Sequence, residues 1–240
     1  MLSALKSILN NSQTHFLLFD ESQQPLFFSY GLALLESGYS IGALSTQTKP
    51  LLQQHLQQSA LDGIYLYPFK VKEASILCFS SGTLNQQKGI VRSYKSWKNS
   101  FKLIADILTD FPNLRGTVIG SSPYSLSLFG IMESLYREIM PIILPNEHIK
   151  LLERRLEKQK SLLWLTPFHC AFFIKAFKEL RMAPLSEVHC VFVGGAYFSN
   201  AQREVLQQVF PRAKIFSFYG TSETSFISIK TPVRYYRKCR

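Results

Sequence analysis

Short apolar runs alternate with longer helical segments along most of this chain, and this alternation constrains its fold more than any other feature. The apolar runs have the length and composition of buried strands, and they are expected at 40–44, 63–67, 75–79, 117–120, 139–144, 162–165, 188–193 and 214–218. Helices are expected at 50–61, 126–137, 147–160, 168–180 and 200–210. Strands that alternate with helices form βαβ units. The sequence therefore predicts a layered α/β fold with largely parallel sheets flanked by helices.

Three local patterns support individual helices. Ser199 is followed three residues later by Gln202, which is a capping box, and Pro211 ends the helix that follows. Leucines interrupt the glutamine cluster within 50–61, so this segment is interpreted as an amphipathic helix with a neutral polar face. A further apolar stripe with helical spacing is formed by Trp97, Phe101, Ile104 and Leu108.

Composition and charge limit the class of protein. With 240 residues, of which 46% are hydrophobic, the chain can bury a sizeable core and is not intrinsically disordered. Its formal net charge of +11 suggests a nucleic acid, an anionic membrane or a phosphate-rich ligand as partner. Nine of these charges come from two clusters without acidic residues, at 84–102 and 231–240. We therefore interpret the excess as the flank of a phosphate-binding loop plus a basic tail.

Compartment and anchoring follow from the apolar and cysteine patterns. The most apolar stretch, 161–177, is interrupted by Pro167, His169 and Lys175, so no membrane span is expected. The four cysteines contain no CxxC pair, and buried reduced thiols in a cytoplasmic protein are expected. Two His-Cys dipeptides, 169–170 and 189–190, are poor chelating pairs because adjacent strand residues point to opposite faces.

The sharpest chemical signal is a loop after the apolar run 75–79. It contains Ser80, Ser81, Gly82 and Thr83, followed by Lys88. Backbone N–H groups, hydroxyls and a lysine can together hold an anion, although this is not a Walker loop. The competing interpretation is a solvated turn between two strands.

Two further segments follow predicted strands, where ligands of open α/β sheets usually bind. Gly194, Gly195 and Ala196 allow a flat ligand face to approach the backbone, although taken alone they are better explained by a tight strand-to-helix turn. The segment from Tyr219 through Gly220, Thr221 and Ser222 to Glu223 combines a stacking ring, hydroxyls and a carboxylate suited to Mg²⁺. Taken alone, this segment also reads as a polar β-turn.

The order of these three segments resembles the adenylate-forming superfamily, which includes acyl-CoA synthetases, aryl-acid ligases and peptide-synthetase adenylation domains. The loop from Phe79 to Gly89 resembles the family's phosphate loop, with Leu84, Asn85 and Gln87 departing from it, and 219–223 matches its Y-G-x-[TS]-E motif. Ser122–Gly130 resembles the family's P-x-x-H-x-x-G region, where Ser127 stands at the acyl-gating position. Leu165-Thr166-Pro167 resembles its T-x-x-P segment.

The resemblance implies ATP-dependent activation of a small carboxylic acid to an acyl-adenylate, followed by transfer to a thiol of coenzyme A or of a carrier protein. It implies that the loop from Ser80 to Lys88, including Ser81, Gly82 and Thr83, cradles the β- and γ-phosphates. It places Gly194, Gly195 and Ala196 beside the adenine and acyl groups. It packs Tyr219, with Gly220 and Thr221, on the nucleotide. Ser222 would contact the α-phosphate and Glu223 would coordinate Mg²⁺.

By this resemblance, residues 1–230 form an AMP-binding N-terminal domain and residues 231–240 a basic tail. The family's ribose-binding T-G-D segment and its small C-terminal domain with a catalytic lysine are absent after Glu223. The tail is either native, the product of a frameshift or an artificial end. A truncated domain is therefore expected, with impaired or no activity by itself and a possible separate C-terminal domain or acyl carrier protein as partner.

Two alternatives remain at this point. One is a non-catalytic nucleotide-binding or partner-binding remnant of the same fold. The other is a basic nucleic-acid-binding protein unrelated to ATP, which we rank last because it leaves the segments 194–196 and 219–223 unexplained. An apolar acyl pocket is suggested by Phe168, Phe172, Phe173 and Phe198, although buried aromatic residues more often belong to a plain core.

Overall fold

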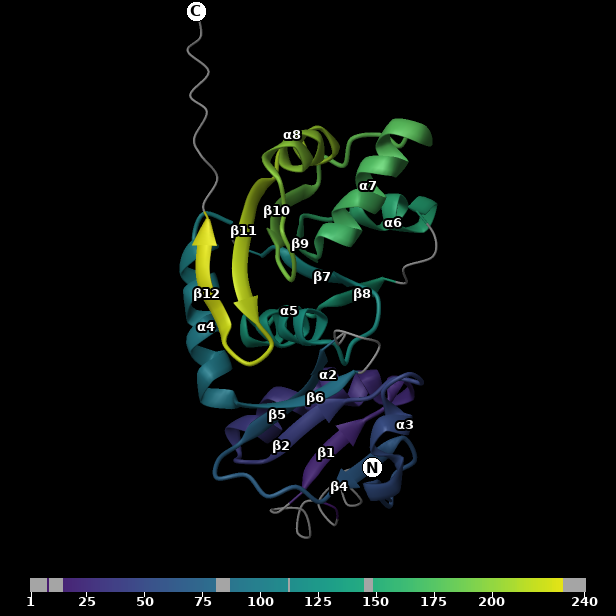
Figure 1. The fold of residues 1–240 in the computed structure, drawn as a ribbon, viewed down its shortest axis with the longest axis vertical. Coiled ribbons are helices and arrows are strands. Elements are labelled where there is room, and N and C mark those ends of the chain that lie inside the picture. The colour runs from purple at the N-terminus through teal and green to yellow at the C-terminus, as the bar shows by residue number, and fades with distance from the viewer. Residues whose placement is uncertain (1–7, 9–14, 81–86, 112, 145–148, 231–240) are drawn as a thin grey trace, which may run out of the picture.

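The computed structural model describes residue 8 and residues 15–80, 87–111, 113–144 and 149–230. Within these ranges the chain forms two six-stranded sheets with helices between and outside them (Figure 1). The strand order is β3-β4-β1-β2-β5-β6 in the first sheet and β12-β11-β10-β9-β7-β8 in the second. The layered α/β fold predicted from the alternation of strands and helices is confirmed.

The first sheet is mixed. Its strands are β1 (Phe16–Phe19), β2 (Ser40–Ala43), β3 (Gln57–Gln58), β4 (Ile64–Tyr67), β5 (Ser75–Ser80) and β6 (Lys88–Ser93). β1, β2 and β5 are parallel, while β3, β4 and β6 join through antiparallel pairs. The helical segments of this half are η1 (Glu21–Gln23), α2 (Gln24–Glu36), α3 (Lys49–Leu52) and η2 (Gln53–His55).

The second sheet is parallel except at one edge. Its strands are β7 (Arg115–Ile119), β8 (Ile142–Leu144), β9 (Ser161–Leu165), β10 (Val188–Val193), β11 (Lys214–Thr221) and β12 (Ser225–Lys230). Only β12 pairs antiparallel, with β11. The helices are α4 (Tyr94–Ile107), α5 (Ser125–Tyr136), α6 (Ile149–Leu156), α7 (Pro167–Glu179) and α8 (Asn200–Val209).

Strand side chains feed two separate cores because successive residues point to opposite faces. On β9, Leu162 and Trp164 join the core between the two sheets, while Leu163 and Leu165 join the core beneath α6, α7 and α8. All four side chains are essentially inaccessible to solvent. A run of four apolar residues such as 162–165 is typical of a strand in a sheet covered on both faces.

The helix α5 joins the two halves of the molecule. It lies between the sheets beside α2 (Figure 1), and Gly130 permits its close approach, since a Cβ there would lie 2.5 Å from Trp164 Cδ1. Just before α5, the Pro123 carbonyl accepts a 2.9 Å hydrogen bond from the Phe79 amide at the end of β5. The first sheet is therefore tied directly to the start of this helix.

One predicted element is wrong. The glutamine-rich segment 50–61 does not form one helix: helix α3 ends at Leu52, η2 follows, and β3 then pairs with β4 at the sheet edge. Leu56 is already extended, and the Ser59 hydroxyl donates to the Leu61 carbonyl in a local turn. Edge pairing and this turn together satisfy backbone groups that a helix would otherwise have paired.

The capping box and the apolar stripe are confirmed. Ser199 and Gln202 each bond the other's backbone N–H at the start of α8. The stripe 97–108 lies on α4 and at its C-terminal cap, with its four side chains buried. No helix in the described part of the chain has both the length and the apolar character needed to cross a bilayer.

Candidate functional site

Two of the three chemical segments lie at one end of the second sheet. Gly194 directly follows β10. In the segment 219–223, residues 219–221 lie at the end of β11, and residues 222–223 belong to the turn that leads to β12. Strands β10 and β11 are parallel neighbours in which Val193 pairs with Ser217, so both segments emerge at the same edge. This is the edge at which ligands bind in open α/β sheets.

The third segment lies on the hairpin of β5 and β6. Ser80 and Lys88 are cross-strand partners in this hairpin. Ser81, Gly82 and Thr83 lie outside the described residues, so the structure gives no account of the loop itself. Beside it, Gln87 donates a 2.7 Å hydrogen bond to the hydroxyl of Tyr124, which donates in turn to Gln47 over 2.8 Å.

Arg92 connects this hairpin to the segment 219–223. Its guanidinium on β6 donates to the backbone carbonyl of Glu223 and to the hydroxyl of Ser96. Burial of the guanidinium lowers the pKa of Arg92. The contact spans 131 residues of sequence and brings the hairpin and the carboxylate segment together.

The turn at 221–224 presents its polar side chains to solvent. The Thr221 amide donates to Thr224 Oγ1 over 3.1 Å, and the Thr224 amide donates to Thr221 Oγ1 over 3.2 Å. A hydrogen bond from Thr221 lowers the pKa of Glu223, with further contributions from the charges of Arg92 and Lys88. Glu223 is therefore an exposed, ionised carboxylate beside two cationic side chains.

A cavity of about 550 Å³ opens beside β11. Five sequence-predicted site residues line it: Gly195, Ala196, Tyr219, Gly220 and Thr221. The ring of Tyr219 is 63% exposed. Arg203 of α8 supports its wall, since its guanidinium donates to Ser217 Oγ over 2.8 Å and lies 5.6 Å from the Phe198 ring centroid. We call this space the large cavity. Its complete lining is Val193, Gly195, Ala196, Tyr197, Phe198, Ser217, Phe218, Tyr219, Gly220, Thr221, Ser228 and Lys230.

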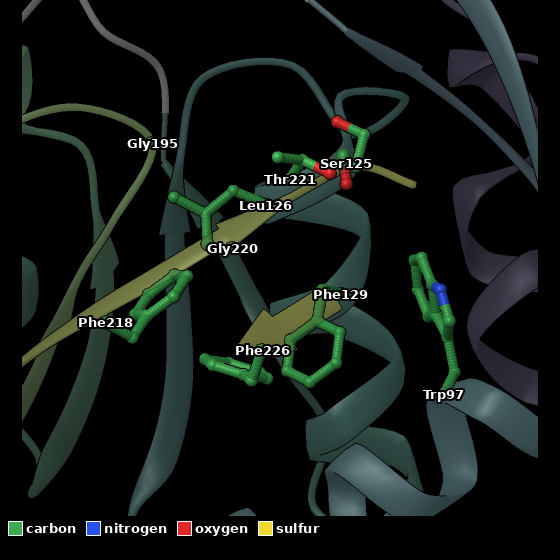
Figure 2. Close-up of a pocket in the computed structure, with 10 residues that line it drawn as sticks. Trp97, Ser125, Leu126, Phe129, Gly195, Phe218, Gly220, Thr221 and Phe226 are labelled. Atoms are coloured by element: carbon green, nitrogen blue, oxygen red, sulfur yellow. The ribbon is translucent and has the colours of Figure 1, made fainter. Parts of the chain in front are cut away.

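A second cavity of about 100 Å³, here called the small cavity, shares part of this wall (Figure 2). Figure 2 shows the hydroxyls of Ser125 and Thr221 at one end and the rings of Phe129, Phe218 and Phe226 at the other. Its complete lining is Trp97, Ser125, Leu126, Phe129, Gly195, Phe218, Gly220, Thr221, Ser222 and Phe226. The small cavity is thus hydroxyl-rich at one end and aromatic at the other.

The phenylalanines that the sequence suggested for an acyl pocket lie in different environments. Phe173 is fully buried in the core beneath α7, Phe168 is 74% exposed, and Phe198 lines the large cavity. Ser127 is not among the residues that line either cavity. Sequence reasoning missed Phe226 as a wall residue, and it assigned Trp97 only to a core stripe.

The described cysteines are buried free thiols, as expected: Cys78, Cys170 and Cys190. Cys78 lies on β5, and its thiol donates to the Ile90 carbonyl over 3.6 Å. Burial raises its pKa to about 11, although a hydrogen bond with Ser125 and the charge of Arg92 partly oppose this shift. Burial likewise raises the pKa of Cys170 to about 12.

Comparisons with known proteins show which proteins this chain is similar to. No protein-family model matches the chain. The chain is 25% identical over 155 residues to an uncharacterized acyl-CoA ligase, YhfT of Bacillus subtilis, covering 64% of this chain and 31% of that protein. It is also 25% identical over 178 residues to a putative long chain fatty acid-CoA ligase, VraA of Staphylococcus epidermidis, covering 72% of this chain and 38% of that protein. The chain spans about a third of the length of the curated relatives it matches.

Solved structures show the same fold over nearly the whole chain. VinN, solved in complex with L-aspartate, superposes with a TM-score of 0.67 at 15% identity, covering 95% of this chain and 69% of that one. The N-terminal subdomain of Klebsiella oxytoca NpsA, solved with 3-hydroxybenzoyl-AMSN, gives 0.63 at 18% identity, covering 96% and 67%. The chain therefore shares the fold of these adenylation domains, and its resemblance to adenylate-forming enzymes agrees with the acyl-CoA ligases among its curated relatives.

Proposed function

We propose that this chain binds ATP and a carboxylic acid and supports formation of an acyl-adenylate. The observation that carries the proposal is the meeting of three separate segments where β6 of the first sheet contacts one end of the second sheet. They are Lys88 and Arg92 on β6, Gly195 after β10, and Glu223 after β11. Two cavities of different character adjoin that end of the second sheet. A nucleotide and a small apolar acid need just such a pair of neighbouring spaces.

The phosphates are assigned to the cationic and hydroxyl-bearing side of the site. Lys88 and Arg92 supply positive charge, and Ser80, Thr221 and Ser222 supply hydroxyl donors. By the family resemblance, Ser81, Gly82 and Thr83 complete the cradle of the β- and γ-phosphates. Charge-assisted hydrogen bonds of this kind stabilise the negative charge that accumulates on phosphate oxygens during the reaction.

The nucleoside is assigned to the large cavity. Its volume of about 550 Å³ falls within the range typical of small-molecule sites. The exposed ring of Tyr219 offers a stacking surface for adenine. Gly195, Ala196 and Gly220 line the same cavity and leave room for the nucleoside because they have small side chains or none. By the family resemblance, Gly194 lies beside them.

Glu223 fits a divalent cation, because its ionised and exposed carboxylate supplies the oxygen ligand that Mg²⁺ prefers. When bound, Mg²⁺ would neutralise phosphate charge. In the proposed reaction a carboxylate oxygen attacks the α-phosphorus and forms a new P–O bond. The bond to the bridging oxygen breaks, and pyrophosphate leaves with that electron pair. A thiol of coenzyme A or of a carrier protein then takes the acyl group and AMP is released.

The nucleotide site is tested by calorimetry on the 240-residue chain with Mg·ATP. We expect saturable binding that Lys88→Ala and Glu223→Gln each weaken by about tenfold, the loss of one charged contact. Lys95→Ala is the matched control, because it removes an exposed lysine from the same basic cluster. Binding that is unaffected by Lys88→Ala and Glu223→Gln, or equally reduced by Lys95→Ala, would contradict the proposal.

Catalysis is tested separately from binding, because the chain spans only about a third of its curated relatives. ATP–pyrophosphate exchange is measured with a panel of carboxylic acids. Acid-dependent exchange that Glu223→Gln abolishes would support activation by this chain. Binding of Mg·ATP without exchange would support the alternative, a nucleotide-binding module that does not catalyse adenylation by itself.

A further inference from the structure

We infer that Tyr124 is a positioning residue that fixes the start of β6, and with it Lys88, for the phosphates of the nucleotide. The inference rests on the proposed function and gives a role to side chains that the proposed function leaves unused. It is carried by two hydrogen bonds of one hydroxyl group and by the place of Tyr124 in the fold.

The hydroxyl of Tyr124 joins two side chains from distant parts of the chain. It accepts a hydrogen bond from Gln87 Nε2 over 2.7 Å and donates one to Gln47 Oε1 over 2.8 Å. A phenol hydroxyl can donate one hydrogen bond while it accepts another, so the two bonds are compatible. Gln87 directly precedes Lys88, the first residue of β6. The relay from Gln47 through Tyr124 therefore ends where the chain enters β6.

Tyr124 is itself held by its backbone and by its ring. It is the N-terminal cap residue of α5, and its carbonyl accepts a 2.8 Å hydrogen bond from the Leu128 amide. Its ring packs against the buried cluster of the first sheet that contains Leu77 and Phe79. A side chain supported in this way presents its hydroxyl at a defined position.

The acceptor at the other end of the relay is also held. Gln47 lies in the turn between β2 and α3, where its amide donates to Ser45 Oγ over 3.3 Å. The Ser45 amide donates to Thr48 Oγ1 over 2.9 Å, and both of these hydroxyl residues are buried. Serine and threonine hydroxyls that bond nearby amides in this way fix the backbone of a turn. Gln87 is therefore tied to two fixed elements, the start of α5 and the turn before α3.

The start of α5 thus contacts both strands of the hairpin that carries the phosphate-binding segment. Pro123 accepts a 2.9 Å hydrogen bond from the Phe79 amide on β5. Tyr124, the next residue, holds Gln87 at the start of β6. Strand β6 is the outermost strand of the first sheet and pairs with β5 on one side. The relay adds a second attachment at the point where strand pairing comes from one side.

Fixing the backbone at Lys88 should favour the phosphates more than the nucleoside. Lys88 is exposed, and an exposed lysine loses conformational freedom when it binds a phosphate. A backbone that is already in place lowers this cost, so more of the attraction between the charges appears as affinity. The nucleoside is assigned to the large cavity, which does not include Lys88 or Tyr124 in its lining.

The first test needs no nucleotide and measures amide hydrogen exchange. Tyr124→Phe keeps the ring and removes the hydroxyl, and Gln87→Met removes the donor. Each should speed exchange of the amides of residues 88–91 by about fivefold, the effect of one hydrogen bond on local opening, and leave β10 unchanged. Because both variants break the same bond, the double variant should exchange no faster than either single one. Unchanged exchange in β6 in both single variants would overturn the inference.

The second test compares the affinities of Mg·ATP and AMP by calorimetry. Tyr124→Phe should weaken Mg·ATP binding by about fivefold and AMP binding by less than about twofold, because AMP lacks the β- and γ-phosphates. Tyr65→Phe is the matched control. It removes a tyrosine hydroxyl from the same buried cluster, but that hydroxyl accepts from Lys49, so both measurements should stay unchanged.

Equal weakening of Mg·ATP and AMP by Tyr124→Phe would show that Tyr124 merely supports the fold, and it would overturn the inference. A natural chain that binds Mg·ATP no more tightly than AMP would instead count against the proposed function. In that case the exchange measurement still decides whether Tyr124 fixes the start of β6.

Discussion

The carboxylate of Glu133 is fully buried within α5 and is neutralised one helical turn later by Arg137. Arg137 Nη2 donates to Glu133 Oε2 over 3.1 Å, and its Nη1 donates to the Leu114 carbonyl over 2.9 Å. Burial raises the pKa of Glu133, and the guanidinium opposes that shift. The pair belongs to the interior between the sheets and lines neither cavity, so its role is structural.

Removing one member of this pair should therefore destabilise the fold. Glu133→Ala leaves a buried guanidinium without its partner and should lower the free energy of unfolding by about 3–5 kcal/mol. The double variant Glu133→Met with Arg137→Leu should recover much of that loss, because no unpaired charge remains. Urea denaturation measures both effects. A loss below about 1 kcal/mol in the single variant would contradict the structural assignment.

Arg92 is expected to matter for ligand binding more than for folding. Arg92→Met removes the contact with the Glu223 carbonyl and should weaken Mg·ATP binding by about tenfold, the worth of one hydrogen bond to a charged group. Arg92→Lys should rescue little, because a single ammonium cannot replace a fork that reaches both Glu223 and Ser96. Calorimetry provides the measurement. If the Arg92 variants lost melting temperature in parallel with affinity for Mg·ATP, the role of Arg92 would be to stabilise the fold instead.

The N-terminus of α7 depends on a histidine cap. Thr166 accepts from the His169 amide, and His169 Nδ1 accepts from the Thr166 amide over 3.2 Å. Burial lowers the pKa of His169, so its ring is neutral in the folded chain under conditions that protonate it in the unfolded chain. The same Thr166 lies next to Gly195, since a Cβ there would be 3.8 Å from Thr166 Cγ2.

The cap should make stability depend on pH in a defined direction. Between the ordinary histidine pKa of about 6.5 and the lower folded value, only the unfolded chain takes up the proton, so stability falls as pH falls. His169→Gln cannot titrate and should flatten the change in melting temperature between about pH 7.5 and about pH 5.5. His55→Gln, at an exposed histidine, is the control. Identical pH profiles for the natural chain and His169→Gln would contradict this account.

Which elements the sequence revealed depended on how their apolar residues were arranged. The capping box at Ser199 and the predominantly apolar strands β9 and β10 carry strong local signals, and they were predicted within a few residues. Helix α2 was missed because apolar residues occupy most of its circumference, as suits a helix packed between two sheets. The segment 50–61 was assigned wrongly because its edge strand consists of two exposed glutamines. Such a strand lacks the alternation of apolar and polar residues by which a strand is predicted.

At the scale of the whole molecule, one core crosses the boundary between the two sheets. It contains Leu17 and Ile41 of the first sheet together with Leu162 and Phe192 of the second, joined through α5. Such a shared core means that neither sheet can lose its packing without exposing the other. The two halves therefore form one cooperative unit, despite their separate strand orders.

This shared core predicts a single unfolding transition for the described part of the chain. Far-ultraviolet circular dichroism and tryptophan fluorescence should give coincident denaturation curves, as for other cooperative single units. Leu128→Ala, at a fully buried position of α5, should lower the free energy of unfolding by about 2–5 kcal/mol, and both probes should report the same decrease. Two separated transitions, or a shift in only one probe, would show that the sheets unfold independently.

The candidate site was predicted only in part because its parts come from distant regions of the chain. The order of the motifs indicated that residues near 80–88, 194–196 and 219–223 act together. Nothing local indicated that Arg92 reaches Glu223, or that Phe218 closes over Gly194. Both contacts arise from strand pairing and sheet stacking, which depend on tertiary structure.

The burial of Cys78 protects its thiol from acylation. An acyl-adenylate is a strong acylating agent, and in the proposed reaction it would form close to this thiol, which lies beside Ser125 and Arg92. With a pKa of about 11, only about one thiol in ten thousand is ionised at pH 7, and the thiolate is the reactive form. Strand β5 thus carries a nucleophile held in its inert state, which in the proposed reaction would leave the activated acyl group for an external acceptor.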